Sequence, residues 1–286
     1  MPGNPVLFQE AVVLALLDDG LGRRERDQAL CEDREEDEED PDETDVDLHG
    51  VTDGEQHAAS VSKPLAAGRP AGGTLGGVNR LGALVYDRLV MKRSQEAGLA
   101  DARREALAPA RGAVLEIGAG TGLNIPAYPR MGITRLVLTE PHEPMRRQIE
   151  AKLAGAPAPV EIVDASAEAL PFDDATFDTV TGTLVLCEAE HPAAALDEIA
   201  RVLKPGGHYL FLEHVRSDDP GLARAQDRWA PLWKRVAGGC NCNRDTLATI
   251  AASGLDVESH RIGRFPKSPK VVSPLLSGSA VRGDVL

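Results

Sequence analysis

The chain has 286 residues, with 31 Lys and Arg against 45 Asp and Glu, and a formal net charge of −14. Four cysteines without a regular framework exclude a disulfide-stapled scaffold and fit a reducing compartment, so we expect a cytoplasmic protein. About 200 residues remain for one well-cored α/β domain once the unusual beginning of the chain is set aside.

Most of the negative charge lies in the first eighty residues. Residues 1–80 hold 19 acidic and 7 basic side chains, a net of −12, which leaves −2 for residues 81–286. The acidic run 32–47 cannot bury apolar surface, and the Gly/Ala/Pro-rich run 64–78 is typical of a linker. We therefore expect residues 1–80 to be a largely disordered acidic leader, either a solvated tail or a docking segment for a basic partner.

Two partner classes are disfavoured by the same reading. The apolar run Ala11–Leu17 is too short to span a bilayer and no basic residue precedes it, so we expect neither an integral membrane segment nor a signal peptide. The nearly neutral domain shows no basic stripe, so nucleic acid is not the expected partner. Residues 81–110 are expected to form helices that lead into the first strand.

The stretch from Val114 to Gly122 is the most informative part of the chain. Ala113 to Ile117 is an apolar run that predicts a buried parallel strand, and Gly118, Gly120 and Gly122 follow it. Glycines permit positive φ and let a flat ligand lie against bare backbone. Alone this pattern is weak evidence, because an ordinary turn in an α/β domain can also show it.

Two carboxylates narrow the range of ligands that the glycine loop could bind. Glu116 occupies the approach to the loop, where a dinucleotide-binding fingerprint carries another glycine, and an anion there repels a pyrophosphate but suits a cation. Glu140 ends the second predicted strand, Leu136–Thr139, where it can accept hydrogen bonds from both ribose hydroxyls of an adenosine. Glu140 alone does not distinguish such an adenosine-containing ligand from NAD.

The motif Glu116-x-Gly118-x-Gly120-x-Gly122 resembles the first motif of class I S-adenosylmethionine-dependent methyltransferases. Three later segments strengthen the resemblance to the type 11 group, and some details are similar to its thiol methyltransferase-like branch. These segments are the turn 164–172 after strand Val160–Val163, the strand Thr179–Cys187 after Phe177-Asp178, and the helix ending 201–207 before strand His208–His214.

The resemblance implies an α/β, Rossmann-like fold with a seven-stranded, mostly parallel sheet, helices on both faces and a final antiparallel pair, 257–262 and 278–282. It implies S-adenosylmethionine as cofactor and a small-molecule acceptor with a thiol, amine or hydroxyl. The cofactor residues it assigns are Glu116, Gly118, Ala119, Gly120 and Gly122 around the methionine end, Glu140 and Pro141 at the ribose, Ser166 and Ala167 at the adenine, and Thr183 and Leu184 at the end of the fourth strand.

Residues for the acceptor side are less sharply indicated. His214 could take a proton from the acceptor and Glu213 could orient it, but adjacent strand residues point to opposite faces, so both cannot easily serve one pocket. Tyr86, Cys187, Trp229 and Trp233 are candidates for the acceptor pocket, with ordinary packing as their alternative role.

No metal is expected, because Cys240-Asn-Cys242 has no second cysteine pair to complete a thiolate site. Between Trp229 and Trp233 the helix contains Pro231, which should kink it, and Asn243 is expected to cap a helix from Arg244 to Ser253. Two other functions remain open at this point: a cofactor-binding protein without catalysis and an NAD-dependent oxidoreductase.

Overall fold

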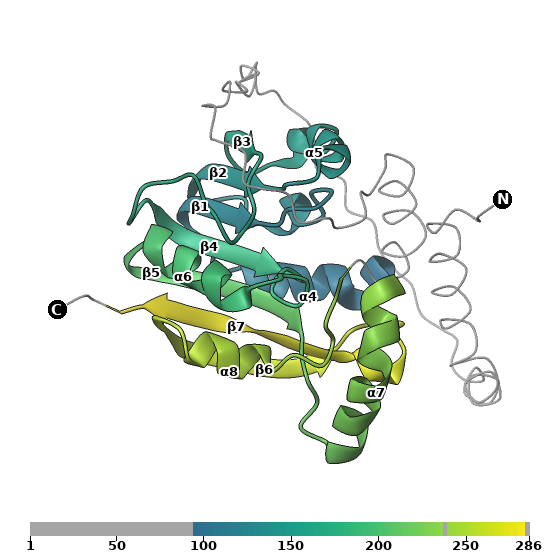
Figure 1. Cartoon of the computed structure of the whole chain (residues 1–286). Helices are drawn as coiled ribbons and strands as arrows, with labels where there is room; N and C mark the ends of the chain where they lie inside the picture. Colours follow the sequence, from purple (N-terminus) through teal and green to yellow (C-terminus); the bar gives the residue numbers. More distant parts are fainter. Residues whose placement is uncertain (1–93, 237–238, 284–286) are drawn as a thin grey trace, which may run out of the picture.

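The computed structural model describes residues 94–236 and 239–283. The predicted leader, its linker and Tyr86 lie outside the described residues. In the part that is described, one seven-stranded sheet forms the centre of the molecule (Figure 1). Its strands are β1 (Gly112–Ile117), β2 (Ile133–Thr139), β3 (Val160–Val163), β4 (Phe177–Thr183), β5 (Leu203–His214), β6 (Leu255–Arg264) and β7 (Pro274–Arg282).

The strand order is β3-β2-β1-β4-β5-β7-β6, with β1 to β5 parallel and β7 antiparallel to both of its neighbours. Figure 1 shows the reversal, because the arrow of β7 points away from that of β4. The predicted Rossmann-like fold is confirmed. The order reverses between β1 and β4, and open α/β sheets bind ligands beyond the carboxyl ends of the strands at such a point.

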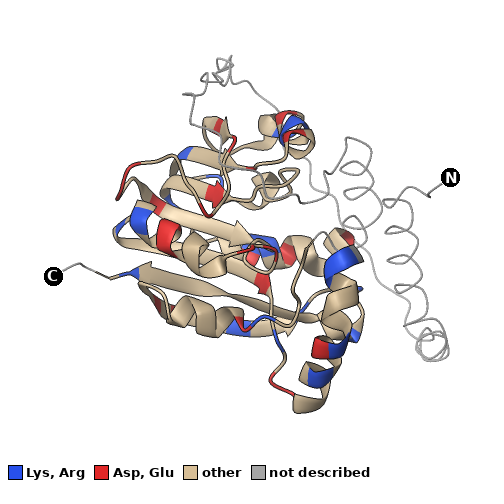
Figure 2. Cartoon of the chain, in the orientation of Figure 1, with Lys and Arg blue, Asp and Glu red and all other residues tan. Residues whose placement is uncertain are grey.

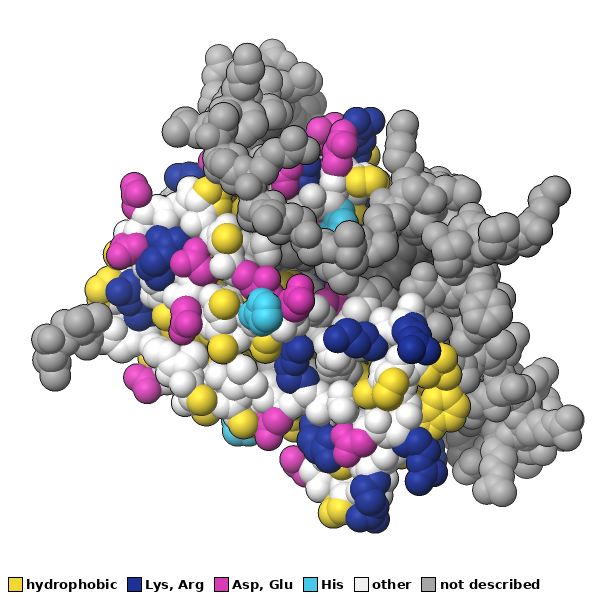
Figure 3. All heavy atoms as spheres, in the orientation of Figure 1, with side chains coloured by type: hydrophobic (Ala, Val, Ile, Leu, Met, Phe, Trp, Pro, Cys, Tyr) yellow, Lys and Arg dark blue, Asp and Glu magenta, His cyan; other side chains and the backbone are white. Residues whose placement is uncertain are grey.

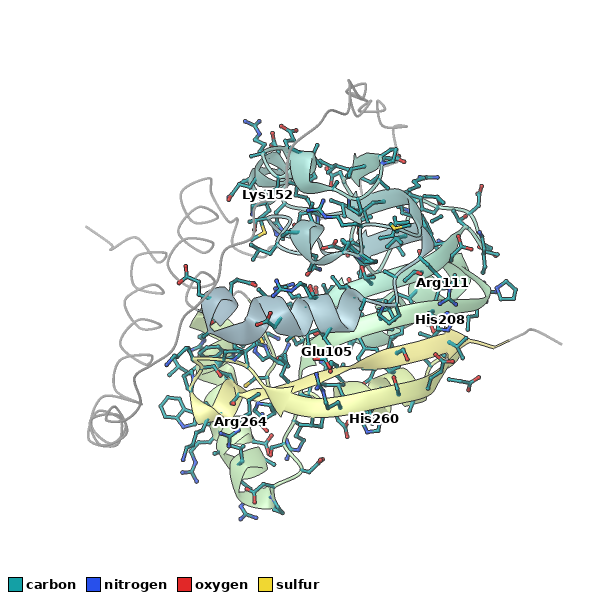
Figure 4. The ribbon with its side chains drawn as sticks, turned by 180° about the vertical axis from the view of Figure 1, so that it is seen from behind. Glu105, Arg111, Lys152, His208, His260 and Arg264 are labelled. Carbon is teal, nitrogen blue, oxygen red and sulfur yellow. The ribbon has the colours of Figure 1, made fainter. Side chains whose placement is uncertain are left out.

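Helices cover both faces of the sheet. On one side lie α6 (Pro192–Val202) and α8 (Thr246–Ala251), and α4 (Ala100–Leu107) crosses the other (Figures 1 and 4). Figure 4 also places Arg111 beside His208, whose ring Nδ1 lies 3.4 Å from the Arg111 guanidinium, at the end of the sheet where β1 begins. The remaining helical elements are η2 (Gln95–Leu99), η3 (Ile125–Ala127), α5 (Glu143–Glu150), η4 (Leu153–Gly155), α7 (Pro220–Val236) and η5 (Lys270–Val272).

Alternation along each strand divides the core into two layers. In β1, Leu115 and Ile117 pack into the layer under α6, whereas Val114 packs into the layer that contains Leu107 of α4. Both layers are apolar because a sheet covered on two faces buries every side chain. Glu116 is therefore a charged residue at an interior position of a buried strand, and its burial needs a physical reason.

Several predicted boundaries are corrected by the structure. The fourth strand ends at Thr183 rather than Cys187, because Leu184 adopts a φ of +61° and turns the chain away from the sheet. The fifth strand begins at Leu203; its pairing with β4 is interrupted after Leu203 and resumes at His208. The cap of α8 is Asp245 rather than Asn243, and its carboxylate accepts a hydrogen bond from Ala248 N at 3.0 Å.

Charge is distributed unevenly over the described surface. Basic side chains recur along α7 (Figure 2), and they gather on the face shown in Figure 3. Exposed members of this group are Arg224, Arg228, Lys234 and Arg235. The near-neutral total of the domain concealed this local excess, so the exclusion of a nucleic-acid partner stays a prediction. None of the helices in the described ranges is long and apolar enough to cross a membrane.

The tight packing of β7 between β5 and β6 gives a test of the fold. A Cβ on Gly278 would overlap the carbonyl oxygen of Ser259 and lie 2.7 Å from Cζ of Phe211, whereas a Cβ on Gly263 would meet Leu275 O at 3.7 Å. We expect Gly278→Ala to lower the free energy of unfolding by about 2 kcal/mol or more, because both neighbours must shift. Gly263→Ala is the control and should change it by much less. Urea unfolding of both variants decides, and equal stabilities would contradict the packing described.

Candidate active site

The glycine loop leaves β1 as bare backbone facing open space. Gly118 and Gly120 both have a φ of +56°, and Gly122 has a φ of +79°. A Cβ on Gly118 would lie 2.7 Å from a methyl group of Val185, but a Cβ on Gly120 would meet nothing within 4 Å. Ala119 N donates to Thr139 O at 2.8 Å, which fixes the loop on β2. The loop therefore offers a cradle at Gly120 where a flat ligand can lie against the backbone.

Glu140 lies beside this cradle, where the sequence places a ribose. Its carboxylate accepts hydrogen bonds from Gly120 N at 2.9 Å and from His142 N at 2.8 Å, and the His142 ring Nδ1 lies 2.9 Å from the same oxygen. The contact with Glu140 raises the pKa of His142. Pro141 stands between these two residues. A buried carboxylate held from both sides is pre-positioned to accept further hydrogen bonds.

Glu116 lies beneath the loop in a buried hydrogen-bond network. Asn124 Nδ2 donates to one of its oxygens at 2.9 Å and the Tyr128 hydroxyl to the other at 2.8 Å. Burial raises the pKa of Glu116 to about 7, and the hydrogen bonds from Tyr128 and Asn124 oppose that rise. The carboxylate is thus already engaged within the protein, and its predicted contact with the cationic methionine end of the cofactor stays a prediction.

The network continues to a residue that the sequence reading missed. Arg103 of α4 is buried, and its guanidinium donates to Asn124 Oδ1 at 2.6 Å and to Thr183 Oγ1 at 2.7 Å. Arg103 also favours the charged form of Glu116 and so opposes the rise in its pKa. The available signal was spacing, because Arg103 lies four residues after Leu99 and four before Leu107, on the buried side of the helical segment. Its partners could be identified only once β1, β4 and α4 were packed together.

The predicted adenine turn follows β3. Ser166 is half-buried and its hydroxyl accepts a weak hydrogen bond from Glu168 N at 3.3 Å, while Ala167 is buried in the core. Asp164, the other polar residue of this turn, is exposed and paired with Arg146 at 2.9 Å. The turn begins at the same edge of the sheet as the glycine loop, and its contact with adenine stays a prediction.

Glu213 is held by the backbone of the turn after β4. Its carboxylate is fully buried and accepts hydrogen bonds from three successive backbone groups, Val185 N and Leu186 N at 2.9 Å and Cys187 N at 3.2 Å. Burial raises its pKa to about 7 despite these bonds. Glu213 thus fixes the turn that follows Leu184, and its predicted part in orienting the acceptor stays a prediction.

His214 points away from Glu213, as strand geometry predicts, and meets two cysteines. Its ring Nδ1 lies 3.4 Å from Cys240 Sγ and 3.9 Å from Cys187 Sγ, and the ring stacks on Phe265 with centroids 4.8 Å apart. All three residues are buried. Cys187 hydrogen-bonds Cys240 and, with His214, holds the pKa of the Cys240 thiol well below its usual value against the effect of burial. By contrast, burial raises the pKa of Cys242 to about 12.

The candidate pocket residues divide into two kinds. Trp233 packs against the apolar cluster of Cys187, Cys240, Cys242 and Val272, and its side chain helps to lower the pKa of Cys240. Trp229, one turn earlier on α7, has an exposure of 42% and does not belong to that cluster. The structure therefore groups Trp233 with Cys187 and leaves Trp229 on the surface.

The loop does not provide what a pyrophosphate needs. Residues 121–124 form turns, and only the short η3 follows, so no α-helix begins at the glycine loop to present its N-terminus to phosphate. The carboxylates of Glu116 and Glu140 adjoin the loop instead, and the Lys152 ammonium is already bonded to the loop through Thr121 O at 2.6 Å. This arrangement fits a ligand with a ribose and positive charge, as in S-adenosylmethionine, better than a dinucleotide.

Comparison with known proteins agrees with this geometry. A methyltransferase-domain family matches residues 115–211. Thiol S-methyltransferase TMT1B of Rattus norvegicus is 33% identical over 173 residues, which cover 59% of this chain and 70% of that protein. The chain belongs to the S-adenosylmethionine-dependent methyltransferases. The demethylmenaquinone methyltransferase of Clavibacter sepedonicus is 38% identical over 127 residues, covering 44% of this chain and 51% of that one.

Solved structures place the methyltransferase in the same fold. A SAM-dependent methyltransferase of Leishmania major superposes with a TM-score of 0.52 at 17% identity, covering 69% of this chain and 77% of that one. Geranyl diphosphate methyltransferase in complex with GPP and sinefungin gives a TM-score of 0.52 at 14% identity, covering 65% and 78%. These structural similarities support the fold and nothing further, because the sequence identities are low. The cofactor of the methyltransferase is S-adenosylmethionine, and the NAD-dependent and non-catalytic alternatives are set aside.

The role of Glu140 can be tested by binding. Glu140→Gln removes the charge that strengthens hydrogen bonds from ribose hydroxyls, so we expect about 10- to 100-fold weaker binding of S-adenosylhomocysteine. The control is Glu150→Gln, a change at an exposed glutamate at the end of α5. Titration calorimetry measures both. Unchanged affinity in Glu140→Gln would remove Glu140 from the site.

Burial of Glu116 predicts a pH dependence of stability. A carboxyl group with a pKa of about 7 in the folded protein and 4.5 in the unfolded chain favours folding below pH 4.5 and progressively loses that contribution up to pH 7. We expect Glu116→Gln to lack this fall, which amounts to about 3 kcal/mol. In urea unfolding from pH 4.5 to 8, the free energy of unfolding of the variant should therefore rise relative to that of the parent as the pH rises. Parallel pH profiles would mean that Glu116 is not perturbed.

Proposed function

We propose that this methyltransferase transfers the methyl group of S-adenosylmethionine to the sulfur of a small-molecule thiol. The observation that carries the proposal is the similarity to a thiol S-methyltransferase, 33% identical and covered over 70% of its length. The human thiol S-methyltransferases TMT1B and TMT1A have 33% and 28% identity over comparable lengths. Relatives with other acceptors, such as the demethylmenaquinone methyltransferase, match over about half of their length.

The chemistry at the carboxyl edge of the sheet supports a thiol over a hydroxyl or an amine. Glu140 is assigned to the ribose, and Glu213 is fully buried and bonded to three backbone N–H groups, so we assign neither to take a proton from a poorly acidic acceptor. Glu188, beside Cys187, is the remaining carboxylate at this turn, and desolvation raises its pKa. A thiol needs the least help, because its pKa is about 8.5 and a small fraction is already an effective nucleophile at neutral pH.

The residues of this chain then have distinct tasks. We assign Glu116 and Gly118 to Gly122 to the methionine end of the cofactor, Glu140 and Pro141 to its ribose, Ser166 and Ala167 to its adenine, and Thr183 and Leu184 to the boundary between cofactor and acceptor. The sulfonium of the cofactor is an activated methyl donor. The main contribution of the protein is therefore to hold the acceptor sulfur in line with that methyl group.

A pair of glycine variants tests the proposal. Gly120→Ala places a methyl group in the cradle that would hold the cofactor, while Gly132→Ala imposes similar strain, with a φ of +89° and no neighbour within 4 Å, in the turn before β2. We expect Gly120→Ala to lower kcat/KM for methylation of a thiol by at least about 100-fold, because a 1 Å displacement of a reactant can cost that much. Gly132→Ala should keep the activity of the parent protein.

The acceptor is identified by comparing methyl release with small thiols, amines and phenols under the same conditions. Turnover confined to thiols is the expected result. Equal or faster turnover with an amine or a phenol would replace the thiol proposal while leaving the methyltransferase assignment intact. Loss of activity in both glycine variants would show that strain, and not occupation of the cradle, explains the effect.

A further inference from the structure

Three potential metal ligands converge from distant parts of the chain at the carboxyl edge of the sheet. Cys187 lies in the turn after β4, His214 ends β5, and Cys240 follows α7. Their donor atoms all lie within 4.8 Å of one another. We propose that Cys187, His214 and Cys240 bind one Zn²⁺ ion, and that its fourth coordination position takes the sulfur of the acceptor thiol.

The distances within the cluster fit this ion. With Zn–S of about 2.3 Å and Zn–N of about 2.0–2.1 Å, a tetrahedral site separates nitrogen and sulfur ligands by about 3.6 Å. The two measured separations from His214 Nδ1, 3.4 Å to Cys240 Sγ and 3.9 Å to Cys187 Sγ, lie on either side of that value. The two nitrogen–sulfur separations therefore need to change by only a few tenths of an ångström to match zinc, and the two sulfur atoms already lie within 4.8 Å of each other.

The surroundings hold the three donors toward one another. Asn241 N donates to Cys187 O at 2.8 Å, so the segment that carries Cys240 is fixed to the turn that carries Cys187. Glu213 holds the same turn through its backbone N–H groups, and Phe265 sets the plane of the His214 ring. The other ring nitrogen, Nε2, is buried without a hydrogen-bond partner in the described part of the chain. The polar contacts of this imidazole are thus with the two sulfur atoms alone.

The composition of the set indicates a catalytic rather than a structural site. Structural zinc sites are closed by four protein ligands, whereas residues 94–236 and 239–283 supply this set with three. Two cysteines and one histidine with a free position are a known catalytic arrangement. Cys242 is the additional thiol of the same apolar cluster, but its sulfur is not among the converging donors. Cys187 lies three residues beyond Leu184, so an ion in this set would be bound at the edge assigned to the cofactor.

The role of the ion rests on the proposed thiol methylation, although the site itself does not. The acceptor R–SH replaces a water molecule on zinc and releases its proton to solvent. The resulting thiolate sulfur attacks the methyl carbon and forms the new S–C bond, while the C–S⁺ bond breaks and leaves its electron pair on the sulfur of S-adenosylhomocysteine. The thioether product carries no charge, binds zinc weakly and gives way to water.

Metal binding is tested first, on the full chain without a metal-binding tag. We expect about one zinc per chain by elemental analysis after purification without chelators. Cys187→Ser and Cys240→Ser should each weaken zinc binding by more than about 100-fold, since even partners of ligands contribute 10- to 100-fold. The matched control is Cys242→Ser, which should bind zinc like the parent. The site is overturned if the zinc-free parent protein takes up no zinc from a buffered zinc solution. It is also overturned if Cys187 and Cys240 form a disulfide that persists after treatment with a reductant.

Cobalt substitution tests the open position without reference to activity or to variants. Co²⁺ bound to two thiolates should show sulfur-to-metal charge-transfer absorption, and a small thiol acceptor should intensify it by adding a third. A spectrum that does not respond to the thiol overturns the role of the fourth position. Thiol methylation at the parent rate by metal-free Cys240→Ser overturns the metal mechanism and leaves the proposed function standing. A zinc-loaded protein that binds thiol but methylates only amines or phenols overturns the proposed function and with it the role of the ion, leaving only the metal site.

Discussion

The arrangement of the candidate site depends on how one buried carboxylate, that of Glu213, obtains its hydrogen bonds. Glu213 cannot reach solvent, so it takes its hydrogen bonds from the backbone of Val185, Leu186 and Cys187. This fixes the turn after β4, and the turn has two faces. Val185 lies directly under Gly118 of the glycine loop, while Cys187 lies beside His214. The hydrogen bonds to Glu213 thereby set the position of the glycine loop relative to Cys187, His214 and Cys240.

A second polar network performs the same task on the other side of the sheet. Glu116, Asn124 and Tyr128 join the start of the glycine loop to the residues that follow it, and Arg103 connects α4 to Thr183. Burying such groups is costly unless they are paired, and both oxygens of Glu116 and the amide of Asn124 have partners inside the network. The loop is thus anchored from below, and Gly120 alone faces the open space above it.

The order of elements could be predicted from the sequence because each motif is local. A strand end or a helix start can be predicted within a few residues from each of three features. These are the apolar run before Gly118, the carboxylate at Glu140 and the proline at the start of α6. The end of β4 was placed four residues too late, because Leu184-Val-Leu-Cys187 is apolar and β-prone. What stops the strand there is a partner from β5, Glu213, which no local pattern reveals.

The convergence of Cys187, His214 and Cys240 was hidden for the same reason. Spacing along the chain singled out Cys240 and Cys242, and the lack of a second pair argued against metal. The fold instead brings Cys187 and His214 together, because β4 and β5 are parallel neighbours whose ends meet at one edge, and the hydrogen bond from Asn241 N to Cys187 O holds Cys240 beside them. Arg103 was missed likewise, since its partners lie 21 and 80 residues away in sequence. Contacts between side chains of distant segments require the packed sheet, and local periodicity carries no information about them.

The place of β7 has a consequence for how the chain matures. His214 stands at the end of β5, directly opposite Leu275, and β7 occupies the whole space between β5 and β6. During synthesis, the strand that carries Glu213 and His214 therefore has an exposed edge until residues 274–282 have left the ribosome. The pairing of β5 with β7 is therefore among the last long-range pairings that can form. The edge of β5 beside Cys187, His214 and Cys240 is consequently covered late, after the strands β1 to β4 that surround the glycine loop have been synthesised.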